Sequence, residues 1–234
     1  MPYKKQYRRR RRARGRNRYP KRSWNEGQGG RITVFKNPSP LPMKFKAVLR
    51  YSDPFEQFIP PQTGNSIGKV FSCNGIYDPD ITRIGHQPSG FDQLMMMYDH
   101  YVVIGAKITT TFVNNDNNHG VVCAVDVRDR PTLEPDMRVS QESGTVKTAV
   151  ITSENSGRGT VTITYKVNPN RFLGRSKPLA DPELKGDSLK NPNEQCYFHI
   201  MMSSLDAGSV DGTSISSIIE YQAIFIEPKP VGLS

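Results

Sequence analysis

Positive charge is concentrated at the beginning of this 234-residue chain. The first 22 residues contain 12 arginines and lysines and no acid, with five consecutive arginines from Arg8 to Arg12. Through residue 31 there are 13 basic residues and one acid, so 32 − 13 = 19 basic and 22 − 1 = 21 acidic residues remain, a net charge of −2. The net charge of +10 therefore belongs to an N-terminal segment attached to a nearly neutral body.

Residues 1–31 lack what an independently stable fold requires. They show no apolar periodicity, and their like charges repel one another. Their few apolar groups cannot offset an ordering entropy of about 1–2 kcal/mol per residue. We therefore expect a disordered arm, whose first 22 residues would reach about 75 Å when extended.

The composition of the arm favours nucleic acid as its partner. Arginine outnumbers lysine nine to three in the first 22 residues, and the planar guanidinium can bond two phosphate oxygens at once. Aromatic rings are interleaved with the charges and can stack on unpaired bases. The predicted phosphate-binding residues are Lys4, Lys5, Arg8, Arg9, Arg10, Arg11, Arg12, Arg14, Arg16, Arg18, Lys21 and Arg22, and the predicted stacking residues are Tyr3, Tyr7, Tyr19 and Trp24.

Other uses of a basic tail stay open at this point. A solvated tail, or one that carries only a nuclear-import signal, has the same composition, and import is also compatible with nucleic-acid binding. A membrane-surface role is disfavoured, because neither an amphipathic helix nor a lipidation motif accompanies the charges. The charged N-terminus predicts no signal peptide, and no apolar run approaches the ~18 residues of a membrane-spanning helix.

A linker separates the arm from the body. Residues 25–30, Asn-Glu-Gly-Gln-Gly-Gly, have a flexible composition, a short strand-like run follows at 32–35, and prolines at 38, 40 and 42 block regular structure. The predicted organisation is a basic nucleic-acid-binding arm over residues 1–31, a Pro-rich linker over 32–42 and one domain over 43–234.

Alternation of polar and apolar residues dominates the body. In residues 160–165 a threonine face alternates with an apolar face, as expected for a half-buried strand. Eight such runs are predicted as strands, at residues 43–51, 69–76, 101–113, 121–127, 145–152, 160–167, 196–203 and 215–226.

The connections between these strands fall into two alternating classes. Four are fairly short and rich in turn residues: the one with Pro60, Pro61 and Gly64, and those at 114–120, 154–159 and 206–213. The other three are mostly longer, at 79–100, 129–144 and 168–194. Such alternation results when successive strands cross between two sheets and the connections gather at opposite ends. The predicted fold is therefore all-β, an eight-stranded double-sheet jelly roll. The alternative, an immunoglobulin-like sandwich, gives no reason for three long insertions at one end.

One phrase in the body resembles a known family. Residues 74–81, Asn-Gly-Ile-Tyr-Asp-Pro-Asp-Ile, precede Gly-His-Gln-Pro at 85–88, Gly-Phe-Asp-Gln-Leu at 90–94, tyrosines at 98 and 101, and Gly-Ala-Lys-Ile at 105–108. This ordered set of about 35 residues resembles the capsid (coat) proteins of circovirus-like (CRESS-DNA) viruses, which have small circular single-stranded DNA genomes. The resemblance implies a viral jelly roll, about sixty copies in a small icosahedral T=1 shell, and an arm that faces the genome.

The resemblance also implies a function. The chain would be a structural protein that self-assembles and packages viral single-stranded DNA, located in the virion and, during assembly, in the host nucleus. Nuclear-import receptors and a cell-surface attachment factor would be further partners. The residues themselves leave RNA open as cargo, because lysine and arginine bind phosphate in either polymer.

An alternative function is a non-capsid, single-stranded nucleic-acid-binding protein with a β-barrel body and a basic tail. A binder of that type would place basic and aromatic side chains in a groove of the body. The body has a net charge of −2 over residues 32–234, which favours the capsid interpretation.

The segment after Gly90 has helical spacing. Phe91, Leu94, Met95, Tyr98 and Tyr101 would share one face of a helix. Packing of that face on the edge of a sheet is the simplest explanation. The methionines at 95–97 are an alternative subunit contact, since methionine adapts to irregular surfaces.

The sequence offers little for catalysis or metal binding. Histidines at 86, 100, 119 and 199 lack zinc spacing, and Gly157-Arg-Gly159 lacks the following lysine of a phosphate-binding loop. Asp126, Asp129 and Asp136 are more typical of solvated or ion-paired acids than of a nuclease. Cysteines at 73, 123 and 196 are expected as buried free thiols in strands of one sheet. We therefore predict no enzyme, no metal and no cofactor.

Overall fold

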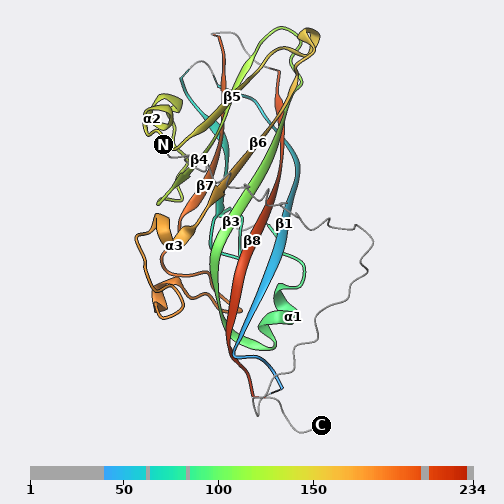
Figure 1. Cartoon of the computed structure of the whole chain (residues 1–234). Helices are drawn as coiled ribbons and strands as arrows, with labels where there is room; N and C mark the ends of the chain where they lie inside the picture. Colours follow the sequence, from blue (N-terminus) through green and yellow to red (C-terminus); the bar gives the residue numbers. More distant parts are fainter. Residues whose placement is uncertain (1–39, 62–63, 83–84, 207–210, 231–234) are drawn as a thin grey trace, which may run out of the picture. The chain divides into compact units, whose positions relative to one another are not determined.

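The computed structural model describes residues 40–61, 64–82, 85–206 and 211–230 (Figure 1). The predicted arm, with all of its proposed binding residues, and most of the linker lie outside these ranges. The strands are β1 (Lys44–Phe58), β2 (Ile67–Ser72), β3 (Tyr98–Asn114), β4 (Val121–Arg128), β5 (Lys147–Ile151), β6 (Thr160–Val167), β7 (Tyr197–Ser204) and β8 (Thr213–Pro228). Short helices are α1 (Phe91–Met95), α2 (Met137–Glu142), α3 (Pro169–Phe172) and the 3-10 turns η1 (Glu154–Ser156) and η2 (Pro182–Leu184). None of the helices in the described ranges is long and apolar enough to cross a membrane.

The eight strands form two four-stranded antiparallel sheets. One has the order β1-β8-β3-β6 and the other β2-β7-β4-β5. Figure 1 shows β1, β8 and β3 side by side in the first sheet. Successive strands change sheet everywhere except between β4 and β5, which are neighbours. This order is that of a jelly roll, so the predicted fold class is confirmed.

The predicted strands are all present, but their ends differ where pairing overrides the sequence pattern. β1 continues seven residues beyond the predicted end at Tyr51, because β8 pairs with it as far as Phe58. An irregularity between Asp53 and Glu56 accommodates Pro54, which cannot donate to the ladder. β2 ends at Ser72 rather than at residue 76.

The core lies between the sheets and is built from their inward faces. Phe71, Phe112, Phe198 and Phe225 are fully buried there. Each sheet contributes to this layer, because alternate residues of an antiparallel strand point to opposite faces.

Two buried tyrosines add polar links between the sheets. The Tyr221 hydroxyl of β8 donates to the carbonyl of Ser72 in β2 at 2.7 Å. The Tyr101 hydroxyl of β3 accepts from the backbone N–H of Ile76 at 3.1 Å, just beyond β2. Burial raises the pKa of both tyrosines, so both remain neutral donors and acceptors in the core.

The three cysteines are buried and free, as predicted, but they do not all lie on strands. Only Cys123 is within a strand, β4; Cys73 follows β2 and Cys196 precedes β7. The backbone N–H of Cys73 donates to the Cys196 carbonyl at 2.7 Å, outside the regular ladder. Burial raises the pKa of Cys73 and of Cys123, which keeps these thiols protonated.

The predicted helical face after Gly90 is only partly correct. α1 covers Phe91–Met95, whereas Tyr98 and Tyr101 belong to β3. Four of the predicted side chains are buried: Phe91 and Met95 belong to the helix, and Tyr98 and Tyr101 to the strand. The helix is short because β3 begins to pair with β8 at Tyr98, opposite Pro228.

A buried lysine connects the two sheets through three carboxylates. Lys69 Nζ of β2 lies 3.1 Å from both carboxylate oxygens of Asp53 in β1. It also lies 2.6 Å from Glu56 and 3.6 Å from Asp80. Burial alone would lower the pKa of Lys69, but its bonds to Glu56 and Asp53 raise it to about 12. Burial raises the pKa of Asp53 despite the lysine, so Lys69 is the counter-charge of the buried Asp53 and Asp80, whereas Glu56 is exposed.

We expect Lys69→Met to destabilise the domain by about 3 kcal/mol at pH 7, because buried carboxylates lose their counter-charge. The pKa of Asp53, already raised in the folded state, should rise further. A raised folded pKa favours the folded state as pH falls, so the loss should be smaller at pH 5 than at pH 7. Urea unfolding at the two pH values measures this, with exposed Lys190→Met as the control. An equal loss at both pH values would contradict the assignment.

Candidate functional site

Four turn-rich connections meet at one end of the jelly roll, as the alternation of their lengths predicted. The backbone N–H of Asn114, after β3, donates to the Gly159 carbonyl before β6 at 2.7 Å. The next N–H, of Asn115, donates to the Gly212 carbonyl before β8 at 3.1 Å. The β1–β2 connection joins through the Pro61 carbonyl, which accepts from the N–H of Ser204 at 2.9 Å.

A buried aspartate organises this end. Asp116 accepts from the backbone N–H groups of Asn118 and His119 at 2.6 Å each, and from that of Asp211 at 2.8 Å. His119 Nδ1 lies 3.2 Å from the same carboxylate. Burial alone would raise the pKa of Asp116, but these hydrogen bonds outweigh burial and hold the pKa far below its usual range. The β3–β4 and β7–β8 connections are thus joined through one charged acceptor.

Two of the long connections meet at the other end. Asn191, before β7, accepts from the N–H of Asp78 at 3.1 Å and donates to the Asp78 carbonyl at 2.8 Å. Gly186 and Tyr101 exchange backbone hydrogen bonds of 2.9 and 3.0 Å. Any side chain at Gly186 would collide with the Tyr101 ring. The β2–β3 and β6–β7 connections are therefore ordered against each other and against β3.

The third long connection, residues 129–144, starts at the same end, because Arg128 at the end of β4 pairs with Tyr197 at the start of β7 and Pro131 borders the same depression as Asp78 and Asn191. It then folds back along the second sheet. Its helix α2 packs on the outer face of the second sheet, where Met137 is buried against Ala124 of β4 and Met201 of β7. The N–H of Met137 donates to the Gly64 carbonyl at 3.0 Å. Burial of this one methionine therefore turns the connection back toward the end that holds the β1–β2 turn.

Ionic contacts hold the same connection in place. Arg128 donates to Asp126 at 2.9 Å and lies 3.8 Å from the buried Glu134. Glu134 also pairs with Arg130. His199 Nε2 lies 2.8 Å from the Arg130 carbonyl, and burial lowers the pKa of this imidazole, which favours its neutral form. These groups have structural partners and face no common cavity.

The acids and histidines singled out in the sequence do not form a common site, although Asp126 of β4 and His199 of β7 are register partners. Asp126 bonds Thr145, whereas Asp136 caps α2 by accepting from the N–H of Arg138. The histidines have separate surroundings: His86 stacks on Tyr51, His100 pairs with Glu227, His119 with Asp116, and His199 contacts a carbonyl. Within the described ranges no group of three or more His, Cys, Asp or Glu side chains is arranged to hold a metal.

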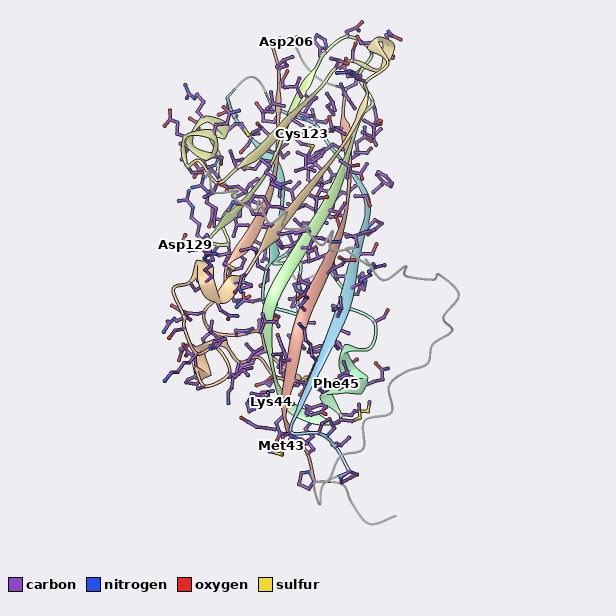
Figure 2. The ribbon with its side chains drawn as sticks, viewed as in Figure 1. Met43, Lys44, Phe45, Cys123, Asp129 and Asp206 are labelled. Atoms are coloured by element: carbon purple, nitrogen blue, oxygen red, sulfur yellow. The ribbon has the colours of Figure 1, made fainter. Side chains whose placement is uncertain are left out.

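An exposed apolar patch, formed by Met43, Phe45, Met96 and Met97, lies beside α1. Met96 is 72 % exposed and Met43 57 %. The Phe45 ring stacks on Tyr98 with a centroid distance of 6.3 Å, which joins the beginning of β1 to the beginning of β3, just after α1. Figure 2 shows Met43 and Phe45 beside this helix. Grouped apolar side chains of this kind mark interaction surfaces.

The sequence indicated only part of this patch. The methionines at 95–97 were an alternative subunit contact, and the structure exposes Met96 and Met97 while burying Met95. Phe45 has the same strand parity as the buried Leu49, so alternation predicts both as core residues. Phe45 is 40 % exposed because it lies at the N-terminal end of β1. Nothing in the neighbouring sequence distinguishes Phe45 from Leu49.

The predicted nucleic-acid-binding residues, from Tyr3 to Trp24, lie outside the described ranges. The structure therefore brings none of them into a site. Their role stays a prediction from composition and spacing.

Similarity to known proteins was found only among solved structures. No protein-family model and no curated protein matches the chain. A structure of desmodium yellow mottle tymovirus is 12 % identical, with 88 % of this chain and 99 % of that chain covered and a TM-score of 0.41. A semi-empty virus-like particle of Macrobrachium rosenbergii nodavirus is 10 % identical, with 87 % of this chain and 92 % of that chain covered and a TM-score of 0.49.

Tobacco necrosis virus is similar at 15 % identity, with 80 % of this chain and 98 % of that chain covered and a TM-score of 0.39. At these identities and TM-scores the likeness adds nothing to the jelly-roll assignment. The assignment follows from the strand order itself.

We expect Asp116→Asn to destabilise the domain by about 2 kcal/mol at pH 7, because three backbone donors lose a charged acceptor. The folded pKa of Asp116 is lowered, so its stabilisation is present above the ordinary value near 3.9 and is lost as pH falls through the lowered pKa. The difference in the free energy of unfolding between the variant and wild type should thus stay constant from pH 7 to 5 and become smaller below about pH 4. Urea unfolding across this range measures it.

Asp129→Asn is the matched control for this variant, since it removes the same charge from an exposed side chain. It should change the free energy of unfolding by less than about 0.5 kcal/mol. Equal losses for the two variants would show that general charge, rather than the Asp116 network, accounts for the effect.

Proposed function

We propose that this chain is the structural subunit of a viral capsid, which assembles with other copies of itself and packages single-stranded nucleic acid through its N-terminal arm. The observation that carries the proposal is the division of charge. Residues 1–31 carry +12, while the remaining chain is a jelly roll with a net charge of −2. A shell subunit needs this combination, because one part must bind a polyanion while the other forms contacts with identical neighbours.

The body supports the assembly part of this proposal. Its long connections are ordered by hydrogen bonds within the subunit, yet they carry exposed apolar side chains such as Met96 and Leu189. A subunit that functions alone has no use for such surfaces, whereas burial between copies would stabilise a shell. The proposed role is accordingly structural and not enzymatic.

The sequence resemblance supports a more specific proposal. The chain would come from a circovirus-like virus, package single-stranded DNA, form a T=1 shell of about sixty copies and be imported into the host nucleus. In the structure, the resembling segment includes the β2–β3 connection, where Asn74 accepts from the N–H of Cys196 at 3.2 Å and Asp78 pairs with Asn191. The family-like residues thus hold the connections beside the apolar patch, which is where a contact between copies would need a fixed geometry.

Deleting residues 1–31 should leave the free energy of unfolding of the body nearly unchanged and reduce affinity for single strands by orders of magnitude. If about half of the 12 arm cations engage phosphates, log affinity against log salt should have a slope near −4 in the full chain. Fluorescence anisotropy with labelled oligonucleotides measures both quantities. Equal affinity with and without the arm would refute the arm assignment.

A substitution pair separates charge from the rest of the arm. Replacing Arg8 to Arg12 by glutamine should make the slope shallower by about 2, because at half engagement two to three contacts are lost, at about 0.7 each. Replacing the same five by lysine keeps the charges and should keep the slope, although the bidentate bonds are lost.

Met96→Glu should prevent particle formation while leaving the subunit folded. The side chain is 72 % exposed, so its effect on the free energy of unfolding should stay within about 0.5 kcal/mol. A charge placed in an apolar contact between copies would be desolvated at high cost. Met96→Leu, which keeps the apolar character, is the matched control and should assemble.

Negative-stain microscopy and analytical ultracentrifugation check this. Normal particles from Met96→Glu would exclude the patch as a contact. A wild-type chain that remains a monomer under all assembly conditions would instead favour the non-capsid nucleic-acid-binding protein.

A further inference from the structure

The outward face of the β1-β8-β3-β6 sheet carries a cluster of basic side chains. We call it the cationic face. Its basic residues come from three different strands, so no run in the sequence reveals them. They are Lys44, Lys46 and Arg50 of β1, Lys107 of β3 and Lys166 of β6.

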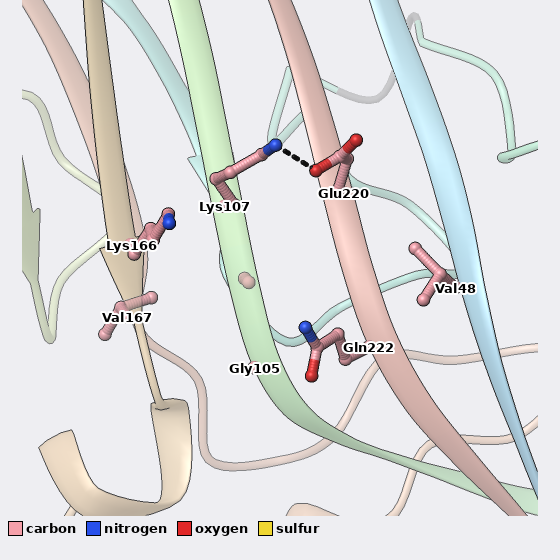
Figure 3. A pocket seen from close by; sticks show the side chains of 8 residues that line it. Val48, Gly105, Lys107, Lys166, Val167, Glu220 and Gln222 are labelled. Atoms are coloured by element: carbon pink, nitrogen blue, oxygen red, sulfur yellow. Dashed lines mark ion pairs between the residues drawn. The ribbon is translucent and has the colours of Figure 1, made fainter. Parts of the chain in front are cut away.

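Strand register places four charges in one row across the sheet. Lys107 is the register partner of both Lys166 and Glu220, and Glu220 is also the partner of Arg50. Neighbouring strands lie about 4.8 Å apart, so the row extends about 14 Å. Figure 3 shows Lys166, Lys107 and Glu220 in this order across the strands.

In the stretch of this face between the register pairs Lys46–Ile224 and Val113–Ser214, the acidic side chain is that of Glu220. It bonds Lys107 and, at 2.6 Å, Arg50. The bond to Lys107, then that to Arg50, lowers the pKa of Glu220 despite some burial, so it stays ionised. Within this stretch the four cations Lys46, Arg50, Lys107 and Lys166 and the one anion leave +3. Lys44 lies just beyond it, opposite Ile226, whose other register partner, His100, pairs with Glu227. The nearly neutral total of the body conceals this local excess.

Three of the cations have no counter-charge nearby. Lys44, Lys46 and Lys166 are exposed and form no ion pair within the part of the chain that the structure describes. Their charges are therefore available to a ligand. Like charges held on one rigid sheet repel one another, and a bound polyanion would relieve that repulsion.

A shallow depression lies at the centre of the face. It has a volume of about 290 Å³ and is lined by Lys107, Lys166, Gln222 and Val48, with Gly105 contributing no side chain (Figure 3). The Glu220 carboxylate also borders it, on the side where it pairs with Lys107. Two ammonium groups and an amide thus border a space large enough for a phosphate group. Gly105 keeps this space open, because a side chain there would lie against Gln222.

Hydroxyl groups continue the face toward the end of the turn-rich connections. Thr109 and Thr164 pair at 3.4 Å between hydroxyl oxygens, and Thr111 and Thr162 at 3.1 Å. Each pair uses one O–H and leaves the other free to donate to an oxygen of a ligand. Hydroxyls and cations are the groups that contact phosphate and sugar.

Strands β3, β6 and β8 place no aromatic residue on the outward side of this stretch, and the exposed aromatic side chain there is Phe55, at the irregularity of the edge strand β1. The central strands therefore offer no platform for base stacking. The groups present favour contact with the phosphates and not with the bases.

We propose that the cationic face is a second nucleic-acid site, which binds the phosphate backbone of a single strand regardless of base sequence. This inference rests on the proposed packaging function and adds a body surface to the arm. A second copy of the chain is a poorer occupant, because two such faces, each with an excess of cations, would repel one another. The cationic face carries the complementary charge for a polyanion.

The test compares two triple variants of the full chain. Lys44→Gln, Lys46→Gln and Lys166→Gln remove three cations from the face. Arg158→Gln, Lys177→Gln and Lys190→Gln remove three exposed cations from connections elsewhere. The face variant should make the salt slope for a single-stranded oligonucleotide shallower by about 2, at about 0.7 for each contact. The control variant should leave the slope unchanged.

A second measurement uses the unaltered chain. Acetylation of lysines in the presence of oligo(dT) or oligo(dA) should be reduced at Lys44, Lys46 and Lys166, equally for both bases, and unchanged at Lys177 and Lys190. This readout does not depend on the folding of a variant. Unchanged acetylation at the face lysines would overturn the proposal, as would protection by only one of the two bases.

The experiments distinguish binding by the cationic face from binding by the arm. If the Arg8–Arg12 glutamine variant has a shallower slope and the face variant does not, the cationic face is refuted while the packaging arm stands. If the face variant alone has a shallower slope, the face is supported and the arm assignment fails. A face variant that stops forming particles with an unchanged slope would show that this surface contacts another copy, which overturns the proposal.

Discussion

The structure depends on the burial of two antiparallel sheets against each other. The inward side chains of β1, β8, β3 and β6 meet those of β2, β7, β4 and β5 in one apolar layer. At about 25 cal/mol per Å² of apolar area removed from water, burial of this kind is the main stabilising term. Tyr221 and Lys69 add directional contacts between the sheets, so their relative position is fixed as well as their proximity.

This arrangement leaves the connections and one outward sheet face for interactions with other molecules. The connections are ordered, since hydrogen bonds to Asp116 join those at one end of the jelly roll and the Asn191–Asp78 pair joins two of those at the other end. An ordered surface loses less conformational entropy on association than a flexible one. The apolar side chains beside α1 are therefore presented in a geometry suited to a repeated contact between identical copies.

Charge is segregated on two scales in this protein. Along the chain, the basic residues gather in the first 31 positions and leave the remaining chain at −2. Within the body, strand register separates the charges again and collects five cations around Glu220 on one sheet face. Both scales favour a polyanionic partner, and the proposed sheet site would offer fixed positions for its phosphates.

The sequence by itself determined the features that depend on neighbouring residues. Period-two alternation gave all eight strands, connection lengths indicated the jelly roll, and the charge run predicts a nucleic-acid-binding arm. The turn of residues 129–144 back over the second sheet was decided by the tertiary burial of Met137. Tertiary structure also decided the exposure of Phe45 and the row of Lys166, Lys107 and Arg50. These features join residues far apart in the chain, and only the pairing of strands brings them together.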